Sequence, residues 1–329
     1  MKNLLVTLSK GGVGKTTTSC QLARYARGLG LRVLVCDFDD QCNATKALER
    51  KYSDNDVVAN RLGLTATELL LRYQEESANA LGPIPEFGVV AGDGAIVREF
   101  VEFARTTDAG SAHSRMYKAQ ANFAQFLGDI TPHYDLCIID SPPAADIRVS
   151  ISLIECDAVL SPIQLSQESI EGIGETLSGQ RGILRIKASS NPDLQFLGFL
   201  PSMVESTPRQ RDALEEIAEV VGQYLLRNEN EELVFLPRRT AFADAQEKGT
   251  SLANLAKTNT AARETWAITK PVFNLILERL GLMPKVRQLD ASRKIQKIES
   301  QPFKVNPDDV LGRAGAAEEG ASNIAAGRR

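Results

Sequence analysis

Short apolar runs alternate along the chain with longer stretches in which apolar side chains recur at helical spacing. Seven such runs occupy residues 3–8, 32–37, 87–92, 135–140, 157–163, 194–204 and 232–237. The stretches between them, for example 16–30 and 208–228, carry Leu, Ile and Ala three and four positions apart. Strands that alternate with helices in this way predict an α/β fold: a doubly wound, mostly parallel sheet with helices on both faces.

Two regions depart from the alternation. Residues 52–82 are longer and more polar than one crossover requires, so we expect a peripheral helical insertion whose helix covers 65–74. From residue 284 onward the apolar pattern fades, and the final residues are mostly Ala, Gly and charged side chains without periodicity. The sequence therefore predicts one domain over 1–283 and a flexible tail over 284–329.

Composition and charge narrow the class of protein. With 43% hydrophobic and 24% charged residues, the chain is typical of a globular protein. The formal net charge of −4 means that any contact with nucleic acid must come from a local basic patch. The 5 cysteines show no C-x-x-C spacing, which favours free thiols over a zinc or iron–sulfur site. No signal peptide and no run of roughly 20 apolar residues is seen, so we expect a cytoplasmic protein.

The first chemical motif follows the first apolar run directly. Residues 8–17 read LSKGGVGKTT, a glycine-rich loop that opens a helix, and they fit the phosphate-binding pattern G-x-x-x-x-G-K-[ST] except that Ser9 stands at the first glycine. Lys15 is expected to reach the β- and γ-phosphates of a nucleotide, and the Thr16 hydroxyl is expected to bind Mg²⁺. The backbone amides that can point at an anion belong to Gly11, Gly12, Val13 and Gly14.

Carboxylates follow two other apolar runs. Asp37, Asp39 and Asp40 stand at the end of one run with Asn43 just beyond them, and Asp140 ends another run before Ser-Pro-Pro. Because the carboxyl ends of parallel strands meet at one edge of a sheet, these side chains are expected beside the phosphate loop. Asp140 is the expected aspartate near Mg²⁺.

Together these motifs resemble the ParA/MinD family of deviant-Walker ATPases. The family signature K-G-G-x-G-K-[ST]-T stands at 10–17, its D-x-D-P-Q-x-N-A-T motif stands at 37–45 with Asp40 in place of the usual proline, and its D-[CTS]-P-P motif stands at 140–143. The resemblance spans about residues 1 to 280. It implies a slow ATPase that uses ATP and Mg²⁺ and is stimulated by a partner protein.

The resemblance also implies roles for single residues. Lys10 would cross a dimer interface to the phosphates of the partner's ATP, the alternative being an ordinary surface lysine. Asp39 would orient the attacking water, so the catalytic set is Lys10, Lys15 and Asp39, and the metal set is Thr16, Asp37 and Asp140. The nucleotide contacts implied are Lys10, Gly11, Gly12, Val13, Gly14, Lys15, Thr16, Thr17, Asn43, Pro237 and Arg238.

Among the relatives, the residues favour the ParA branch. Its members form ATP-bound sandwich dimers that bind DNA of the nucleoid non-specifically, and a ParB-like partner releases them by stimulating hydrolysis, which positions a plasmid, a chromosome or another large cargo. Cations that could contact DNA phosphates, or be ordinary surface charges, are Arg238, Arg239, Lys257, Arg263 and Lys270. Two alternatives remain: a MinD-like ATPase on a membrane, disfavoured because 284–298 lacks an aromatic anchor, and a metabolic enzyme of the dethiobiotin-synthetase-like type.

Overall fold

A computed structural model of the chain describes residues 1–51, 57–76, 81, 83–102, 109–143, 146–166, 169–180 and 182–299. Its centre is a seven-stranded sheet with the order β3-β4-β2-β5-β1-β6-β7. Every neighbouring pair in this sheet is parallel. The strands are β1 (Lys2–Val6), β2 (Val33–Asp37), β3 (Asn60–Thr65), β4 (Phe87–Ala91), β5 (Leu136–Asp140), β6 (Ala158–Ile163) and β7 (Gln195–Pro201). The predicted doubly wound parallel sheet is confirmed.

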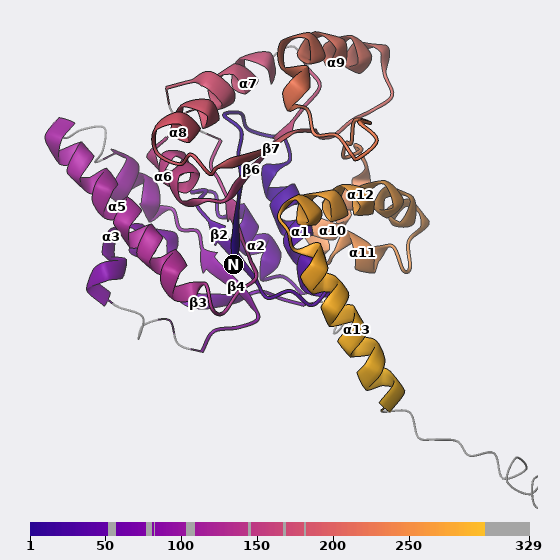
Figure 1. Cartoon of the computed structure of the whole chain (residues 1–329), viewed down its shortest axis with the longest axis horizontal. Coiled ribbons are helices and arrows are strands. Elements are labelled where there is room, and N and C mark those ends of the chain that lie inside the picture. Colours follow the sequence, from indigo (N-terminus) through magenta and orange to yellow (C-terminus); the bar gives the residue numbers. More distant parts are fainter. Residues whose placement is uncertain are drawn as a thin grey trace, which may run out of the picture. The chain divides into compact units, whose positions relative to one another are not determined.

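Helices cover both faces of the sheet (Figure 1). On one face, side chains of α3 (Ala66–Glu76), α5 (Ala109–Ile130), α6 (Ile147–Glu155) and α8 (Ile183–Ser189) join the sheet in one apolar core. On the other face, α1 (Lys15–Gly28) packs on the strands and contacts two helices of the C-terminal part of the chain, residues 240–248 and 260–279. The remaining helices are α2 (Asn43–Leu48), η2 (Val97–Glu102), α7 (Ser169–Ser178), α9 (Pro208–Val221), η3 (Gly222–Tyr224), α10 (Thr240–Lys248), α11 (Leu252–Leu255), α12 (Thr260–Arg279) and α13 (Met283–Glu299).

Two segments differ from the predicted elements. The predicted insertion contains the expected helix α3, but it also supplies the edge strand β3, whose Leu62 and Leu64 alternate with exposed residues. Conversely, residues 232–237 form no strand of the sheet and make only isolated bridges, such as Val204 with Pro237. The β7 edge is already shared with Leu225, which bridges Phe199, so no continuous ladder forms there.

The C-terminal segment begins as a helix. Helix α13 occupies Met283–Glu299, and the rest of the segment predicted as a tail lies outside the described residues. The division of the chain at 283/284 therefore stays a prediction.

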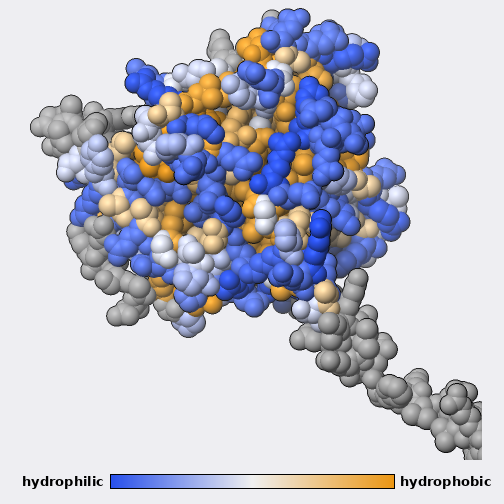
Figure 2. Space-filling view, viewed as in Figure 1, coloured by the Kyte–Doolittle hydropathy of each residue, from blue (hydrophilic) through white to orange (hydrophobic). Residues whose placement is uncertain are grey.

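The surface carries no single dominant apolar patch on the face that Figure 2 shows, where hydrophobic residues are interspersed among hydrophilic ones. Within the described ranges, none of the helices has the length and apolar character needed to cross a lipid bilayer.

Candidate functional site

The glycine-rich loop joins β1 to α1 at the carboxyl edge of the sheet. Gly12 and Gly14 have φ of 74° and 90°, a region that side chains with a β-carbon rarely adopt. The loop borders a cavity of about 260 Å³ that opens beside the first turn of α1. This cavity is lined by Gly11, Gly12, Val13, Gly14, Lys15, Thr16, Thr17, Asp39, Asn43, Pro143 and Met203. The structure thus brings the predicted phosphate loop together with two of the predicted acidic and amide side chains.

Lys15 is the buried cation of this cavity. Its side chain is only 6% exposed, and its ammonium donates hydrogen bonds to the carbonyl oxygens of Leu8 at 3.1 Å and of Lys10 at 2.6 Å. Burial lowers the pKa of Lys15, while the negative charges of Asp140 and Asp39 oppose this shift. An anion with several charges in the cavity would therefore stabilise the charged form of this lysine.

Asp140 lies at the end of β5 and is completely buried. Its two carboxylate oxygens accept hydrogen bonds from the hydroxyls of Thr16 and Ser19, both at 2.8 Å. Burial, and then the nearby charge of Asp37, raise the pKa of Asp140 to about 7, although the two hydroxyls act in the opposite direction. The carboxylate is thus held in place beside the loop at an electrostatic cost that a bound cation would relieve.

Asp37 is held by the first turn of α2. One of its oxygens accepts from the backbone amide of Thr45 at 2.8 Å and from the Thr45 hydroxyl at 2.7 Å. The same hydroxyl accepts from the amide of Gly92 at the end of β4. Burial raises the pKa of Asp37, and the Thr45 bonds lower it. This carboxylate therefore ties β2, α2 and β4 together behind the cavity.

Asp39 and Asn43 face the cavity from the segment that follows β2. Asp39 is 7% exposed, and its carboxylate accepts from the amide of Gln41 at 3.0 Å, which fixes the turn. Asp40, which replaces the proline of the family motif, is partly exposed and lies 3.6 Å from a guanidinium nitrogen of Arg148. The segment 37–43 is thus restrained by several polar contacts.

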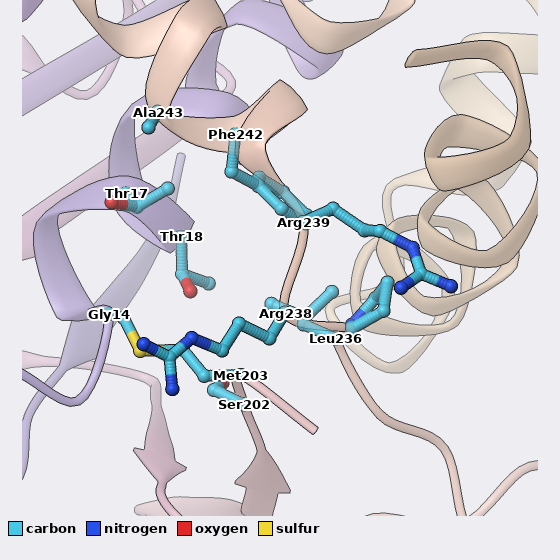
Figure 3. Close-up of a pocket in the computed structure, with 11 residues that line it drawn as sticks. Gly14, Thr17, Thr18, Ser202, Met203, Leu236, Arg238, Arg239, Phe242 and Ala243 are labelled. Atoms are coloured by element: carbon cyan, nitrogen blue, oxygen red, sulfur yellow. The ribbon is translucent and has the colours of Figure 1, made fainter. Parts of the chain in front are cut away.

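A second cavity of about 280 Å³ adjoins the other side of the loop (Figure 3). Gly14, Thr17 and Thr18 of the loop and α1 line it together with Ser202, Met203, Leu236, Pro237, Arg238, Arg239, Phe242 and Ala243. In Figure 3 the side chain of Arg238 extends toward Gly14 and Met203, whereas the side chain of Arg239 points the other way. The predicted residues Pro237 and Arg238 therefore lie next to the phosphate loop, in a mainly apolar pocket that suits a flat ring system.

Lys10 stands at the rim of the loop and is not among the residues that line either cavity. The neighbouring Ser9 donates its backbone N–H to the hydroxyl of Thr176 in α7 at 3.1 Å. A β-carbon at Gly172 of the same helix would lie 3.5 Å from the β-carbon of Lys10. Helix α7 thus supports the backbone from which the Lys10 side chain projects.

The five cations suggested for DNA contact are all exposed, and they divide between two places. Arg238 and Arg239 precede α10 at the second cavity, and Arg238 lies 3.7 Å from Glu205. Lys257 follows α11, and Arg263 and Lys270 lie on α12. Of the five, Arg238 and Arg239 line the second cavity, and none lines the phosphate cavity.

Several residues of the site were not predicted from the sequence, among them Ser19, Met203 and Phe242. Ser19 stands one turn after Lys15, at the spacing that places both on one side of α1, so helical periodicity could have suggested it. Met203 and Phe242 are not themselves motif residues, although Phe242 stands four positions after Arg238. Within the described part of the chain there is no group of three His, Cys, Asp or Glu side chains that could hold a metal by themselves.

A parallel sheet with a glycine-rich loop, a buried lysine and a buried aspartate at its carboxyl edge defines a P-loop nucleotide hydrolase. A family model described as an AAA domain matches residues 1–196, more than half of the chain. The chain belongs to this family, in its ParA/MinD group of P-loop ATPases. The predicted family and the predicted class of enzyme, an ATPase, are confirmed.

Individual relatives extend over most of the chain. Protein IncC of Escherichia coli is 29% identical over 277 residues, which cover 83% of this chain and 69% of IncC. The chromosome-partitioning ATPase Soj of Thermus thermophilus is 26% identical over 282 residues, covering 84% of this chain and 98% of Soj. Among solved structures, cobyrinic acid a,c-diamide synthase of Mycobacterium smegmatis with bound ADP and magnesium has 26% identity and a TM-score of 0.56, covering 78% of this chain and 96% of that one. Its ligands agree with the predicted cofactors, ATP and Mg²⁺.

Proposed function

We propose that this chain is a partition ATPase that works as an ATP-bound dimer. Two copies close face to face over two ATP molecules, the dimer binds DNA of the nucleoid without sequence preference, and a ParB-like partner releases it by stimulating hydrolysis. The cargo is a plasmid, a chromosome or another large assembly in the cytoplasm. The similarity to Soj and IncC over most of the chain supports this proposal.

The observation that carries the proposal is the difference in burial and position between two lysines. Lys15 is buried at the centre of its own phosphate cavity, whereas Lys10 is partly exposed at the rim and lines neither cavity. Since Mg·ATP keeps a net negative charge, a second lysine that arrives from another subunit stabilises the dimer and the charge that develops during phosphoryl transfer. Lys10 is the residue we assign to that task.

The residues at the loop suit Mg·ATP. The amides of the glycine-rich loop and Lys15 would hold the phosphates, and Pro237 and Arg238 would border the base. Thr16 and Asp140 would hold Mg²⁺, which usually takes one or two protein oxygens together with phosphates and water, and Asp37 would support them from behind. The raised pKa of Asp140 marks it as a carboxylate that gains from a cation. When bound, Mg²⁺ would neutralise negative charge on the phosphates. Asp39 would orient the attacking water.

One other function has a specific observation in its favour. The similarity to cobyrinic acid a,c-diamide synthase, at 26% identity, is compatible with an enzyme that couples ATP to the modification of a small molecule. Such an enzyme has no need of a lysine that crosses between subunits or of binding to DNA. The two functions therefore differ in a property that can be measured directly.

The test compares wild type with Lys10→Ala and, as a matched control, with Lys2→Ala. Lys2 is an exposed lysine paired with Asp157 at the other end of β1. With Mg²⁺ and a non-hydrolysable ATP analogue, light scattering should show a doubled mass for wild type and Lys2→Ala, and a monomer for Lys10→Ala that still binds the analogue. DNA retention should need ATP, should fall steeply with salt, and should be lost in Lys10→Ala, because a dimer joins two weak basic surfaces. The proposal would be contradicted if Lys10→Ala still formed dimers. It would also be contradicted if the retention of the wild-type protein on DNA did not depend on the nucleotide.

A further inference from the structure

A buried arginine braces the segment that carries Asp39. Arg148 belongs to the first turn of α6, and its side chain is only 4% exposed. Its guanidinium contacts both carboxylate oxygens of Asp146, at distances of 2.5 to 3.2 Å. The guanidinium also donates to the carbonyl oxygen of Phe38 at 2.9 Å and lies 3.6 Å from a carboxylate oxygen of Asp40.

The bond to Phe38 completes a clamp on one residue of the backbone. The Phe38 amide donates to the carbonyl oxygen of Asp140 at 2.9 Å, so both backbone polar groups of Phe38 are bound, one by Asp140 and the other by Arg148. The Phe38 ring is buried and packs edge-to-face on Phe123. Because Asp39 is the next residue, fixing the peptide between them limits the positions that its carboxylate can take.

Burying a guanidinium in this way costs free energy of hydration, so the arrangement needs an explanation. Taking an arginine and its carboxylate partner out of water loses hydration, and such a pair adds little to stability compared with apolar side chains of the same size. The planar guanidinium can, however, bind a carboxylate with one side and a carbonyl with another in fixed directions, which the ammonium of a lysine on its flexible stem does not impose. The arrangement therefore suits precise positioning more than it suits general stability.

Asp40 stands where the family motif at 37–45 usually has proline. A proline restrains the backbone through its ring. Here the position is occupied by an aspartate that faces Arg148, so the restraint comes from an ion pair with another element. The φ of Asp40 is not positive, unlike that of Cys42 at 53°, so the backbone at 40 is outside the left-handed region that excludes proline.

We propose that Arg148 is a positioning residue for ATP hydrolysis. It holds the Phe38 carbonyl and Asp40, and it thereby keeps Asp39 in place over the phosphate cavity, supplying the backbone restraint that a proline at position 40 would give. The inference rests on the assignment of Asp39 in the proposed function.

The test measures basal ATP turnover with saturating Mg·ATP in Arg148→Met, Arg148→Lys, Asp40→Pro and the double variant Arg148→Met/Asp40→Pro. Arg32→Met is the matched control, because Arg32 pairs with Asp135 beside the opposite end of β2. Arg148→Met should lower kcat by roughly ten- to a hundredfold, the range expected when a reacting group is misplaced, with little change in KM. Arg148→Lys should fall between it and wild type. In the double variant, Asp40→Pro should restore most of the kcat that Arg148→Met loses. Arg32→Met should leave kcat unchanged.

Thermal unfolding of each variant separates positioning from loss of the fold, and Arg148→Lys, which keeps the charge beside Asp146, serves if Arg148→Met does not fold. A folded Arg148 variant with wild-type kcat overturns the proposal. A loss of kcat that Asp40→Pro does not restore also overturns it, since that outcome makes Arg148 merely structural. Asp39→Ala, measured in parallel, tests the underlying assignment by itself: wild-type turnover in that variant refutes the role of Asp39, independently of what the Arg148 series gives.

Discussion

Asp140 offers a direct test of the idea that its carboxylate is kept for a cation. The substitution Asp140→Asn keeps the size and the shape of the side chain but removes its charge. In the wild-type protein without metal, burial and then Asp37 raise the pKa of this carboxyl to about 7 from an ordinary value of 3.8. The ionised form is therefore disfavoured in the folded protein and not in the unfolded chain.

The sign and the size of the effect follow from that difference. A carboxyl whose folded pKa is raised favours folding below its unfolded pKa, and this contribution is lost as the pH rises through the folded value. From 3.8 to about 7 the loss amounts to about 4 kcal/mol, and about 2 kcal/mol of it falls between pH 5.5 and pH 8. Asparagine escapes this loss, but its amide fits the hydroxyls of Thr16 and Ser19 less well than a carboxyl group does, so we expect a net stabilisation of about 2 kcal/mol at pH 8.

The assay is urea unfolding of the nucleotide-free protein in EDTA at pH 5.5 and pH 8. Asp135→Asn is the matched control, because Asp135 immediately precedes the same strand at its opposite end. Burial alone would raise the pKa of Asp135, but hydrogen bonds from Arg32 and Lys285 lower it to about 2. Its contribution is present above pH 3.8 and lost as the pH falls toward 2, so its removal should destabilise the protein at both assay pH values, by about 1 kcal/mol after allowance for the exposed cations.

The two aspartates thus predict opposite signs for one and the same substitution. Asp140→Asn should raise the urea midpoint at pH 8 and reduce the difference between the two pH values, and it should bind Mg·ATP more weakly than wild type. A lower midpoint at pH 8, or an unchanged dependence on pH, would show that the buried carboxylate is not under the electrostatic stress that we derive from the structure.

The remaining predictions concern the two other groups in the cavity. Lys15→Ala should abolish measurable binding of Mg·ATP in isothermal titration, since Lys15 is the buried cation that lines the phosphate cavity. An unchanged affinity for Mg·ATP in this variant would refute the assignment of the phosphate site. Asp39→Ala should still bind Mg·ATP but hydrolyse it on the order of 10²-fold more slowly, because the group that positions water is gone. Turnover at the wild-type rate would move this role to another residue, with Asp37 the next candidate.

The parts of the site that the sequence predicts are those that belong to a local sequence motif or to the end of an apolar run. The glycine-rich loop, Lys15 and Thr16 form one motif, and Asp39 and Asp140 stand at the ends of apolar runs. A parallel sheet brings the carboxyl ends of its strands to one edge, so the topology alone places these groups together. Pro237 and Arg238 could be suggested only through the family resemblance, because nothing in their local pattern indicates which strand end they will meet.

The errors in the strand assignment have the same physical origin. Residues 232–237 have the composition of a strand, but a strand needs a free edge with which to pair, and the β7 edge is partly taken by Leu225. Residues 60–65 look polar because β3 is an edge strand in which only alternate residues, Leu62 among them, are buried. Local preference is therefore overridden at the edges of the sheet, where pairing depends on segments that are distant in sequence.

Asp40 and Arg148 illustrate why a departure from a family motif has to be interpreted together with its spatial neighbours. Taken alone, an aspartate in place of proline suggests a looser segment around Asp39. Arg148 stands in a run of apolar and small residues, IRVSISLI, where an arginine would ordinarily be expected to point to solvent. In the structure the two lie 3.6 Å apart, and Arg148 also holds the backbone of Phe38. If the ion pair replaces the restraint of a proline ring, then a chain can lose Arg148 and keep its ATPase activity only when a restraint is restored at position 40. A substitution at one of the two positions therefore has to be matched by a substitution at the other.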